Sequence, residues 1–247
     1  MVKDLASTSY NMHIAPSFTK EESDHRKSAC IDLLQHIKSP NFVNNIVFCS
    51  EATFFVSGYV NKHNCQIWGL DKPSSFSPAA IKTEKVTVWC GLARNGVYGP
   101  LFFRESLTDE HYVSLLQECF VPSLNKEQLE TMVFQHDDAP IHASIHAKLL
   151  LDKIFCQRWI GTQGPIRWPE KSPDLSPCDF FLWGYIKTTL ATKEYNSLQE
   201  LEGCIDDICK NISAKRLQKV FETFTTRISQ CIQIKGGAIP HLNPRQR

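Results

Sequence analysis

The sequence has no long hydrophobic run, and this absence excludes one class of protein at once. No stretch of its 247 residues approaches the roughly 18 uninterrupted apolar residues of a membrane-spanning helix. The N-terminus, MVKDLASTSYNMH, also has no apolar core of the kind that a secretory signal carries. With 42% hydrophobic and 21% charged residues, the composition is that of an ordinary globular protein. We therefore expect a soluble protein that works inside the cell and has no membrane partner.

Closely paired cysteines are absent as well. The ten cysteines are scattered singly, the closest two are Cys204 and Cys209, and no Cys-x-x-Cys occurs. A chain of this length can bury a substantial core without disulfides or a structural metal. Reduced, buried thiols are the favoured interpretation, and disulfides are the alternative.

An excess of charge of either sign is also missing. The 27 Lys and Arg residues nearly balance the 26 Asp and Glu residues, which leaves a net charge of +1. Such a chain has no global attraction to polyanions, so any contact with nucleic acid must come from local patches or from a partner domain. The chain also has no internal repeat and no low-complexity segment.

The first half of the chain is dominated by strand patterns. Residues 17–38 carry a Ser/Thr N-cap signal and regularly placed apolar residues, which predict a helix. Residues 43–103 then contain β-branched and aromatic runs separated by Gly, Asn and Pro, and they predict a meander of three or four strands. These runs are IVFCS, TFFVSGYV, KVTVWCGL and GVYGPLFF.

The second half alternates strand and helix. A helix is predicted after Thr108, and the short run TMVFQH predicts a strand. Further helices are predicted over residues 141–153, 177–191, 197–210 and 213–233, followed by a C-terminal tail. Strands followed by strand–helix alternation predict an α/β fold, with helices on both faces of a twisted sheet.

Two acidic positions lie where this plan would place a functional site. Asp137 directly follows a predicted central strand, and side chains converge where central strands end. Asp179 opens a predicted helix, with Ser176 as its N-cap and Pro177 at its first position. By pattern alone, Asp137 is more typical of a turn residue and Asp179 of a helix-capping carboxylate.

A histidine pair offers a different kind of site. His142 and His146 are four residues apart on a predicted helix, a spacing that would suit a zinc ion. No third or fourth ligand is evident in the sequence, so surface or hydrogen-bonded histidines are the favoured interpretation.

Several motifs together carry a family resemblance. FQHDDAPIHA followed by WPEKSPDLSPCDFFLWGYIK resembles the catalytic core of the mariner-like (Tc/mariner superfamily) transposases. The segments SEATFFVSGYVNKHNCQIWG and KVTVWCGLARNGVYGPLFF resemble the strands that precede this core. The resemblance covers roughly residues 17–210, and the order of the motifs agrees. It implies a ribonuclease H-like fold, with a central mixed five-stranded sheet, and three carboxylates that bind two divalent ions, Mg²⁺ or Mn²⁺.

The resemblance also assigns roles to individual residues. Asp137 takes the second carboxylate position and Asp179 the third, and His142 matches the histidine that ends the Asp-x-Ala-Pro-x-His motif. Two ions held by such carboxylates would activate a nucleophile and stabilise the leaving oxygen during attack on a DNA phosphodiester. Asp138 stands where a glycine or an amide residue is usual, and we expect it to add negative charge beside the metals.

The first carboxylate position departs from the family pattern. The family reads Ser-Asp-Glu-Ala-Thr-Phe here, whereas this chain reads Cys-Ser-Glu-Ala-Thr-Phe, so Ser50 replaces the first aspartate. A neutral hydroxyl is a poor ligand for Mg²⁺ compared with a carboxylate. Because successive strand side chains point to opposite faces, we expect Glu51 to point away from Asp137 and Asp179 rather than to substitute for the missing ligand.

These observations predict a transposase-derived domain whose metal-dependent DNA cleavage and strand transfer are impaired. The expected partner is DNA, with a possible homodimer, a nuclear location and no small-molecule substrate. A non-catalytic remnant that binds nucleic acid or protein is the alternative, and whether enzyme activity survives is left open. The family's N-terminal helix-turn-helix units have no counterpart in this sequence, so we expect no sequence-specific reading of DNA.

The expected organisation has three parts. Residues 1–40 form an N-terminal linker and helix, residues 41–210 the catalytic domain, and residues 211–247 a C-terminal helix and tail.

Overall fold

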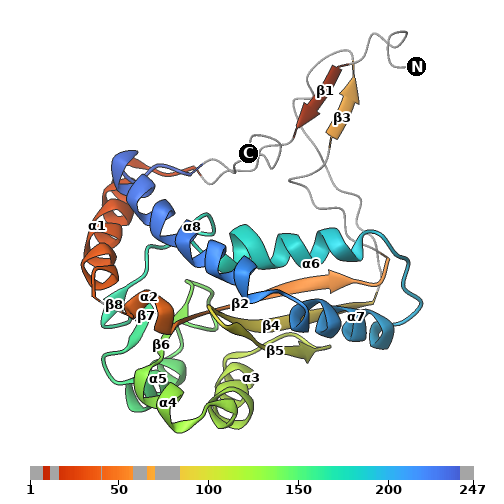
Figure 1. Ribbon diagram of the computed structural model, residues 1–247, viewed down its shortest axis with the longest axis horizontal. Helices are drawn as coiled ribbons and strands as arrows, with labels where there is room; N and C mark the ends of the chain where they lie inside the picture. Colours follow the sequence, from red (N-terminus) through yellow and green to blue (C-terminus); the bar gives the residue numbers. More distant parts are fainter. Residues whose placement is uncertain (1–7, 12–16, 40, 58–65, 70–83, 240–247) are drawn as a thin grey trace.

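A six-stranded mixed sheet forms the centre of the protein. The computed structural model describes residues 8–11, 17–39, 41–57, 66–69 and 84–239. The strand order is β5-β4-β2-β6-β7-β8, in which β2 pairs antiparallel with β4 and parallel with β6 (Figure 1). The strands are β2 (Ile46–Phe55), β4 (Lys85–Ala93), β5 (Gly96–Phe103), β6 (Val133–His136), β7 (Trp159–Gly161) and β8 (Ile166–Arg167).

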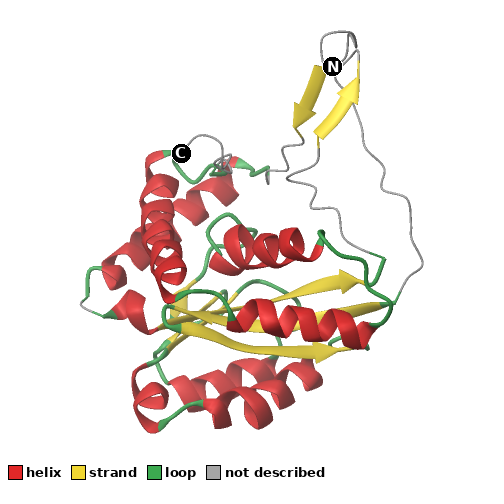
Figure 2. Cartoon of the chain, turned by 45° about the vertical axis from the view of Figure 1, so that its right-hand side comes forward, coloured by secondary structure: helices red, strands yellow, loops and turns green. Residues whose placement is uncertain are grey.

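Helices cover both faces of this sheet, as the sequence predicts. One face carries α1 (Lys20–Ile37), α6 (Trp183–Leu190), α7 (Leu198–Lys210) and α8 (Ala214–Gln233) (Figure 1). The other carries α3 (Asp109–Ser114), α4 (Lys126–Thr131) and α5 (Ile145–Phe155). Short helical segments complete the fold: α2 (Phe42–Asn45), η2 (Leu115–Phe120), η3 (Val121–Ser123) and η4 (Cys178–Leu182). A separate pair, β1 (Thr8–Asn11) and β3 (Gln66–Gly69), lies apart from the main sheet (Figure 2).

Local sequence signals explain where the long helices begin. Thr19 caps α1 through a complete capping box, because its hydroxyl accepts from the Glu22 backbone N–H and the Glu22 carboxylate accepts from the Thr19 N–H. Ser197 and Ser213 cap α7 and α8 in the simpler way, each through its side-chain oxygen. Such caps satisfy backbone N–H groups that have no partner within the helix.

Each face of the sheet packs its own hydrophobic core. On the α8 face, the ring of Phe48 makes edge contacts with Phe221 and Phe224 at centroid distances of 5.5 and 4.7 Å. On the α5 face, Phe134 stacks on Phe155 at 5.3 Å. The first core contains buried residues of α1, the sheet and α8, so the three expected parts of the chain share one core.

The number and extent of the strands differ from the sequence prediction. Five strands were expected in the sheet, but there are six, because β7 and β8 have only three and two residues and carry almost no pattern. The runs IVFCS and TFFVSGYV were expected as two strands, but β2 continues without a break from Ile46 to Phe55. β2 pairs with β4 along nearly this whole length and with β6 over its first four residues, and the sequence between the two runs contains no turn former.

The helix predicted over residues 141–153 begins later than expected, at Ile145. Residues 139–143 form turns, in which the backbone N–H of His142 donates to the Ala139 carbonyl, and Ser144 then caps α5. The loop expected at residues 71–81 and the end of the tail lie outside the described residues. Within the described part of the chain, none of the helices is long and apolar enough to cross a membrane.

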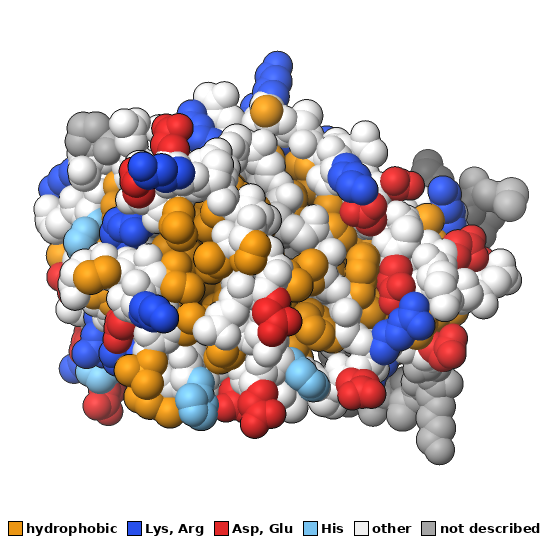
Figure 3. All heavy atoms as spheres, turned by 90° about the horizontal axis from the view of Figure 1, so that it is seen from below, with side chains coloured by type: hydrophobic (Ala, Val, Ile, Leu, Met, Phe, Trp, Pro, Cys, Tyr) orange, Lys and Arg blue, Asp and Glu red, His pale blue; other side chains and the backbone are white. Residues whose placement is uncertain are grey.

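Hydrophobic side chains reach the surface on the face that carries α3, α4 and α5. Figure 3 shows this face from below, with hydrophobic groups exposed between the charged ones. The most exposed of the large ones are Ile145 and Leu149 on α5, each 58% exposed. Because they lie one helical turn apart, they form a small apolar patch on one side of α5.

Candidate functional site

Ser50 and Asp137 lie side by side, as the sequence predicts. The parallel pairing of β2 and β6 sets Cys49 opposite His136, so the next residue of each strand reaches the same place. The Ser50 hydroxyl donates a long hydrogen bond of 3.4 Å to Asp137 Oδ2. Ser50 is buried, whereas Asp137 is partly exposed because β6 ends just before it.

Asp179 reaches this site from a helix start that is docked on β2. The Cys178 thiol donates to the Phe48 carbonyl over 3.1 Å, which fixes the first turn of η4 above the strand. The backbone N–H groups of Asp179 and Phe180 both donate to the Ser176 carbonyl, at 3.0 and 2.9 Å. The Asp179 N–H also lies 3.4 Å from Ser176 Oγ, so the expected cap at Ser176 is present.

The surroundings of Asp179 disfavour its charge. Burial raises the pKa of its carboxyl to about 7, and the negative charges of Asp137 and Glu51 add to this effect against the opposing influence of Ser176 and Lys187. Asp179 remains partly exposed at the surface of the site. Several carboxylates therefore share one place, and their repulsion is not fully compensated by the protein itself.

His142 links two of these carboxylates. Its Nδ1 lies 2.8 Å from Asp137 Oδ1, and its Nε2 lies 3.2 Å from Glu51 Oε1. Burial disfavours a charged imidazole, but the charges and hydrogen bonds of Glu51 and Asp137 outweigh it and raise the pKa of His142 to about 10. For Asp137, burial likewise opposes ionisation, yet the contact with His142 prevails and lowers the pKa of its carboxyl.

The expectation for Glu51 is therefore only half right. Glu51 does lie on the opposite face of β2 from Ser50, since its partner His142 packs against the rings of the α5-side core. It is not remote from the site, however, because His142 connects it to Asp137. Strand alternation predicts the face of a side chain, but not a bridge formed by a residue 91 positions later in the chain.

Asp138 turns away from the other carboxylates and is exposed. Its Oδ2 accepts a hydrogen bond of 3.0 Å from the backbone N–H of Lys171. Lys171 has a positive φ of 52°, and its side chain pairs with Glu22 of α1. Asp138 thus holds the segment between β8 and η4 in place, a role that the family pattern did not suggest.

The two histidines of the zinc hypothesis engage different partners. The His142 side chain is buried between Asp137 and Glu51, whereas the His146 side chain is 69% exposed and lies 3.8 Å from Asp109. Among the residues that the structure describes, no three His, Cys, Asp or Glu side chains are grouped so as to hold a metal ion. The zinc hypothesis therefore finds no third ligand in this part of the chain.

Sequence reasoning missed a buried ion pair that anchors the segment leading to Asp179. Arg26 of α1 lies 2.5 Å from Asp174, and both side chains are almost completely buried. Arg26 also donates to the Ser172 hydroxyl and, over 3.1 Å, to the Gly236 carbonyl. Asp174 Oδ2 in turn accepts from the Ile239 N–H at 2.8 Å. The only available signal was an acidic residue in the SPDLSP motif, five positions before Asp179.

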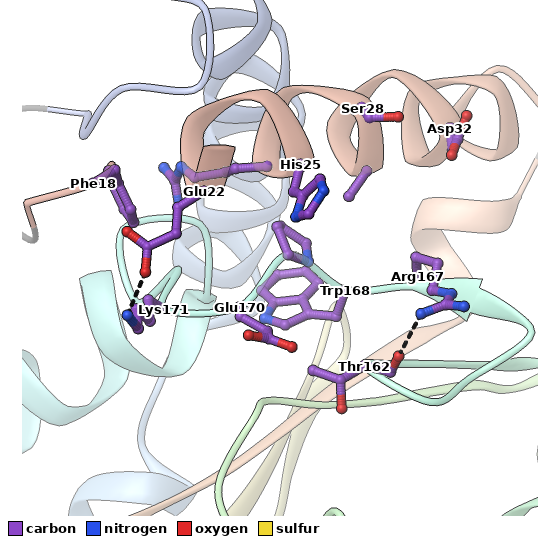
Figure 4. A pocket seen from close by; sticks show the side chains of 13 residues that line it. Phe18, Glu22, His25, Ser28, Asp32, Thr162, Arg167, Trp168, Glu170 and Lys171 are labelled. Carbon is purple, nitrogen blue, oxygen red and sulfur yellow. Dashed lines mark hydrogen bonds and ion pairs between the residues drawn. The ribbon is translucent and has the colours of Figure 1, made fainter. Parts of the chain in front are cut away.

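A cavity of about 330 Å³ lies between α1 and the segment that follows β7 (Figure 4). Trp168 and His25 line its centre, and the Lys171–Glu22 ion pair closes one end. None of Ser50, Asp137 and Asp179 lines it, so this cavity is separate from the carboxylate site. Its lining combines charges of both signs and indicates no particular ligand.

The donors at the carboxylate site are suited to a hard divalent cation. Asp137 and Asp179 supply carboxylate oxygens, which are the ligands that Mg²⁺ prefers. Burial raises the pKa of Asp179 and the charge of Asp137 adds to this effect, and a bound cation would favour the ionised carboxylate. At the third position, however, the Ser50 hydroxyl is hydrogen-bonded to Asp137 rather than adding a charge. The described part of the site therefore offers a cation two carboxylates and one hydroxyl.

Comparison with known proteins identifies the relatives of this chain. No family model matches it. It is 23% identical over 229 residues to the histone-lysine N-methyltransferase SETMAR of Homo sapiens, covering 89% of this chain and 32% of SETMAR. It is 24% identical over 195 residues to the Mariner Mos1 transposase of Drosophila mauritiana, covering 76% of this chain and 54% of that protein. The chain thus spans only about a third to a half of these curated relatives.

The fold gives the same result. A crystal structure of a pre-cleavage Mos1 transpososome matches with a TM-score of 0.76 at 17% identity, covering 93% of this chain and 67% of that one. The Mos1 transposase catalytic domain with raltegravir and Mg matches with a TM-score of 0.71 at 18% identity, covering 91% of this chain and all of that one. The ribonuclease H-like fold expected from the motifs is therefore confirmed, and by sequence and fold this chain is similar to the catalytic domain of mariner-like (Tc/mariner superfamily) transposases.

Proposed function

We propose that this domain derives from an enzyme that cleaved DNA and transferred strands with the help of divalent metal ions, and that Ser50 impairs this activity. The observation that carries the proposal is the position of Ser50. It stands next to Asp137, at the place where the family pattern has its first aspartate. Asp137 and Asp179 would hold the metal, and a carboxylate at position 50 would complete the set.

The known relatives support the reaction class and the metal. The solved structures that resemble this chain include a Mos1 strand transfer complex and Mos1 paired-end complexes with Mg and with Mn. We propose Mg²⁺ or Mn²⁺ as the cofactor, with two ions in the ancestral enzyme and weaker binding in this chain. When bound, such ions activate the attacking oxygen and stabilise the leaving oxygen of a phosphodiester.

The residues of this chain determine how tightly that site would bind a metal ion. Asp137 offers Oδ2 on the side of position 50, because its Oδ1 is engaged by His142 and by the Ala139 N–H. Asp179 offers its carboxylate from the first turn of η4. With Ser50 the site has two anionic ligands instead of three, and the charge that binds two dications is missing.

The proposed partner is DNA, and no small-molecule substrate is expected. Paired-end assemblies of the relatives make a homodimer part of the proposal, and a nuclear location follows from a DNA substrate. The near-neutral net charge argues that this domain alone holds DNA weakly.

The alternative is a non-catalytic remnant that binds nucleic acid or protein. Retention of a partner protein would support the protein-binding version, for which the exposed pair Ile145 and Leu149 on α5 is the candidate contact. DNA retention that falls with salt and without cleavage would support the nucleic-acid version.

The change Ser50→Asp tests the proposal, with Ser50→Asn as a matched neutral control. Restoring the carboxylate should tighten Mn²⁺ binding by roughly 10- to 100-fold in calorimetric titration, since loss of lesser metal-site partners already costs about that much. Asparagine has nearly the same shape as aspartate but carries no charge, so Ser50→Asn should bind Mn²⁺ like the parent protein.

The same variants should then be assayed on nicked and intact DNA duplexes with Mn²⁺. Cleavage by Ser50→Asp and not by the parent would show that position 50 disables the enzyme. Equal Mn²⁺ affinities for all three proteins would refute the metal site, and cleavage by the parent would refute the impairment.

A further inference from the structure

The second carboxylate of the site is held on one side only. Asp137 Oδ1 receives two close contacts, from His142 Nδ1 at 2.8 Å and from the Ala139 backbone N–H at 3.0 Å. Among the residues that the structure describes, its Oδ2 has only the long contact of 3.4 Å with Ser50. The orientation of the carboxylate is therefore set from the Oδ1 side, and Oδ2 faces position 50.

His142 is itself fixed from its far nitrogen. Its Nε2 lies 3.2 Å from Glu51 Oε1, and its side chain is only 1% exposed. A ring held at both nitrogens cannot rotate without losing one of two hydrogen bonds in a buried setting, where unmade bonds are costly. Glu51 thus acts on Asp137 through His142, without touching it.

A stack of rings behind His142 locks its plane. The imidazole of His136 stacks on that of His142, with ring centroids 4.6 Å apart and an interplanar angle of 17°. The ring centroid of Tyr112 also lies 4.6 Å from that of His142. The Tyr112 hydroxyl and His136 Nδ1 are 3.0 Å apart, so the two supporting rings also hold each other. Gly161 leaves the space for this stack, since a Cβ there would lie 2.8 Å from the His136 ring.

We propose that Glu51 and His142 are positioning residues that hold Asp137 with Oδ2 turned toward position 50, whatever residue stands there. The proposal rests on the proposed function, because the orientation of Asp137 matters only if Asp137 holds a metal ion. All the groups that make the bridge come from β2, β6, α3 and the turn before α5, and none of them needs a carboxylate at position 50. Glu51 is engaged in this bridge and does not replace the missing ligand.

The test uses metal affinity in the Ser50→Asp background. Glutamine at position 142 places its amide nitrogen near the position of Nε2 and keeps the contact with Glu51, whereas asparagine places it near Nδ1 and keeps the contact with Asp137. We expect His142→Gln to weaken Mn²⁺ binding by roughly tenfold or more, and His142→Asn to weaken it by clearly less. A purely structural role would make the two substitutions equivalent.

Two further variants complete the set. Glu51→Leu keeps the ring stack and the approximate size of the side chain but removes the acceptor for His142 Nε2, so it reports on the bridge even if substitutions of His142 do not fold; we expect a loss of Mn²⁺ affinity similar to that of His142→Asn, because both variants lose the contact between residues 51 and 142. His146→Gln changes an exposed histidine in the same region of the chain and should have no effect. Equal affinities for Ser50→Asp with and without Glu51→Leu would overturn the proposal.

A measurement without metal separates this proposal from the proposed function. In the parent protein, the His142 Nδ1 proton should be protected from exchange with water and visible by NMR. It should persist in Ser50→Ala and be lost in Asp137→Ala, which removes the acceptor. If Ser50→Asp fails to bind Mn²⁺ but this proton behaves as expected, the metal site is wrong and the bridge stands. If the proton is unprotected in the parent, the bridge does not exist.

Discussion

Two clusters of buried charge flank the segment that leads into η4, and they are built in opposite ways. In the first, the guanidinium of Arg26 meets a single carboxylate, Asp174, and their charges cancel. In the second, Asp137 and Glu51 share one imidazole and Asp179 lies within electrostatic reach of both carboxylates, so negative charge is in excess. A neutralised buried pair is costly to break by removal of one partner, whereas a cluster with uncompensated charge is typical of a site that binds a cation.

The two clusters also differ in how their buried charges are compensated. Arg26 and Asp174 are 1% and 2% exposed; Arg26 also donates to Ser172 and to the Gly236 and Gly237 carbonyls, and Asp174 Oδ2 also accepts from the Ile239 N–H. Asp179 is partly exposed, and yet burial and its anionic neighbours raise its pKa to about 7. The second cluster thus lowers the stability of the folded state, as functional sites commonly do.

The largest effect should come from breaking the self-neutralising cluster. Arg26→Ala would leave Asp174 as a buried, uncompensated charge and would cut the link between α1 and the segment after Gly236. We expect a loss of about 3–5 kcal/mol in the free energy of unfolding, measured by urea denaturation. Arg104→Ala is the control, since the exposed Arg104–Glu202 pair should contribute less than about 1 kcal/mol. Similar losses for both variants would remove the distinction between the clusters.

A smaller effect of opposite sign should come from the anionic cluster. Asp179→Asn removes a carboxyl whose folded-state pKa is raised, so the parent loses stability as the pH rises from about 4 to about 7. In EDTA, the variant should be more stable than the parent by about 1–2 kcal/mol at pH 8, a value reduced by the partial exposure of the group. Below pH 4 the difference should vanish. A variant that is less stable at pH 8 would indicate a structural cap instead.

The smallest effect should come from Asp138, which belongs to neither cluster. Asp138→Ala removes one exposed hydrogen bond to the Lys171 backbone and should cost less than about 1 kcal/mol in thermal or urea unfolding. In the Ser50→Asp background, it should leave Mn²⁺ affinity unchanged, since its carboxylate faces away from the site. A marked change in affinity would mean that the anionic cluster extends to this residue.

Much of the architecture follows from local patterns. The caps at Thr19, Ser197 and Ser213 and the amphipathic repeats after them define the long helices, and the β-branched runs define the long strands. The short strands β7 and β8 carry no such pattern, because two or three residues are held there only by pairing with a neighbour. The helix start at residue 145 likewise depends on the turn that places His142.

The candidate site divides in the same way. The sequence assigned Ser50, Asp137 and Asp179 to one site only through the resemblance of its motifs to the mariner-like transposases, because local pattern alone favoured a turn residue at Asp137 and a helix cap at Asp179. Only the tertiary structure decided that Glu51 reaches Asp137 through His142, that Asp138 holds Lys171, and that Arg26 neutralises Asp174. Each of these contacts joins residues more than 30 positions apart, and such pairs are chosen by how sheet and helices pack, a choice that no short stretch of sequence contains.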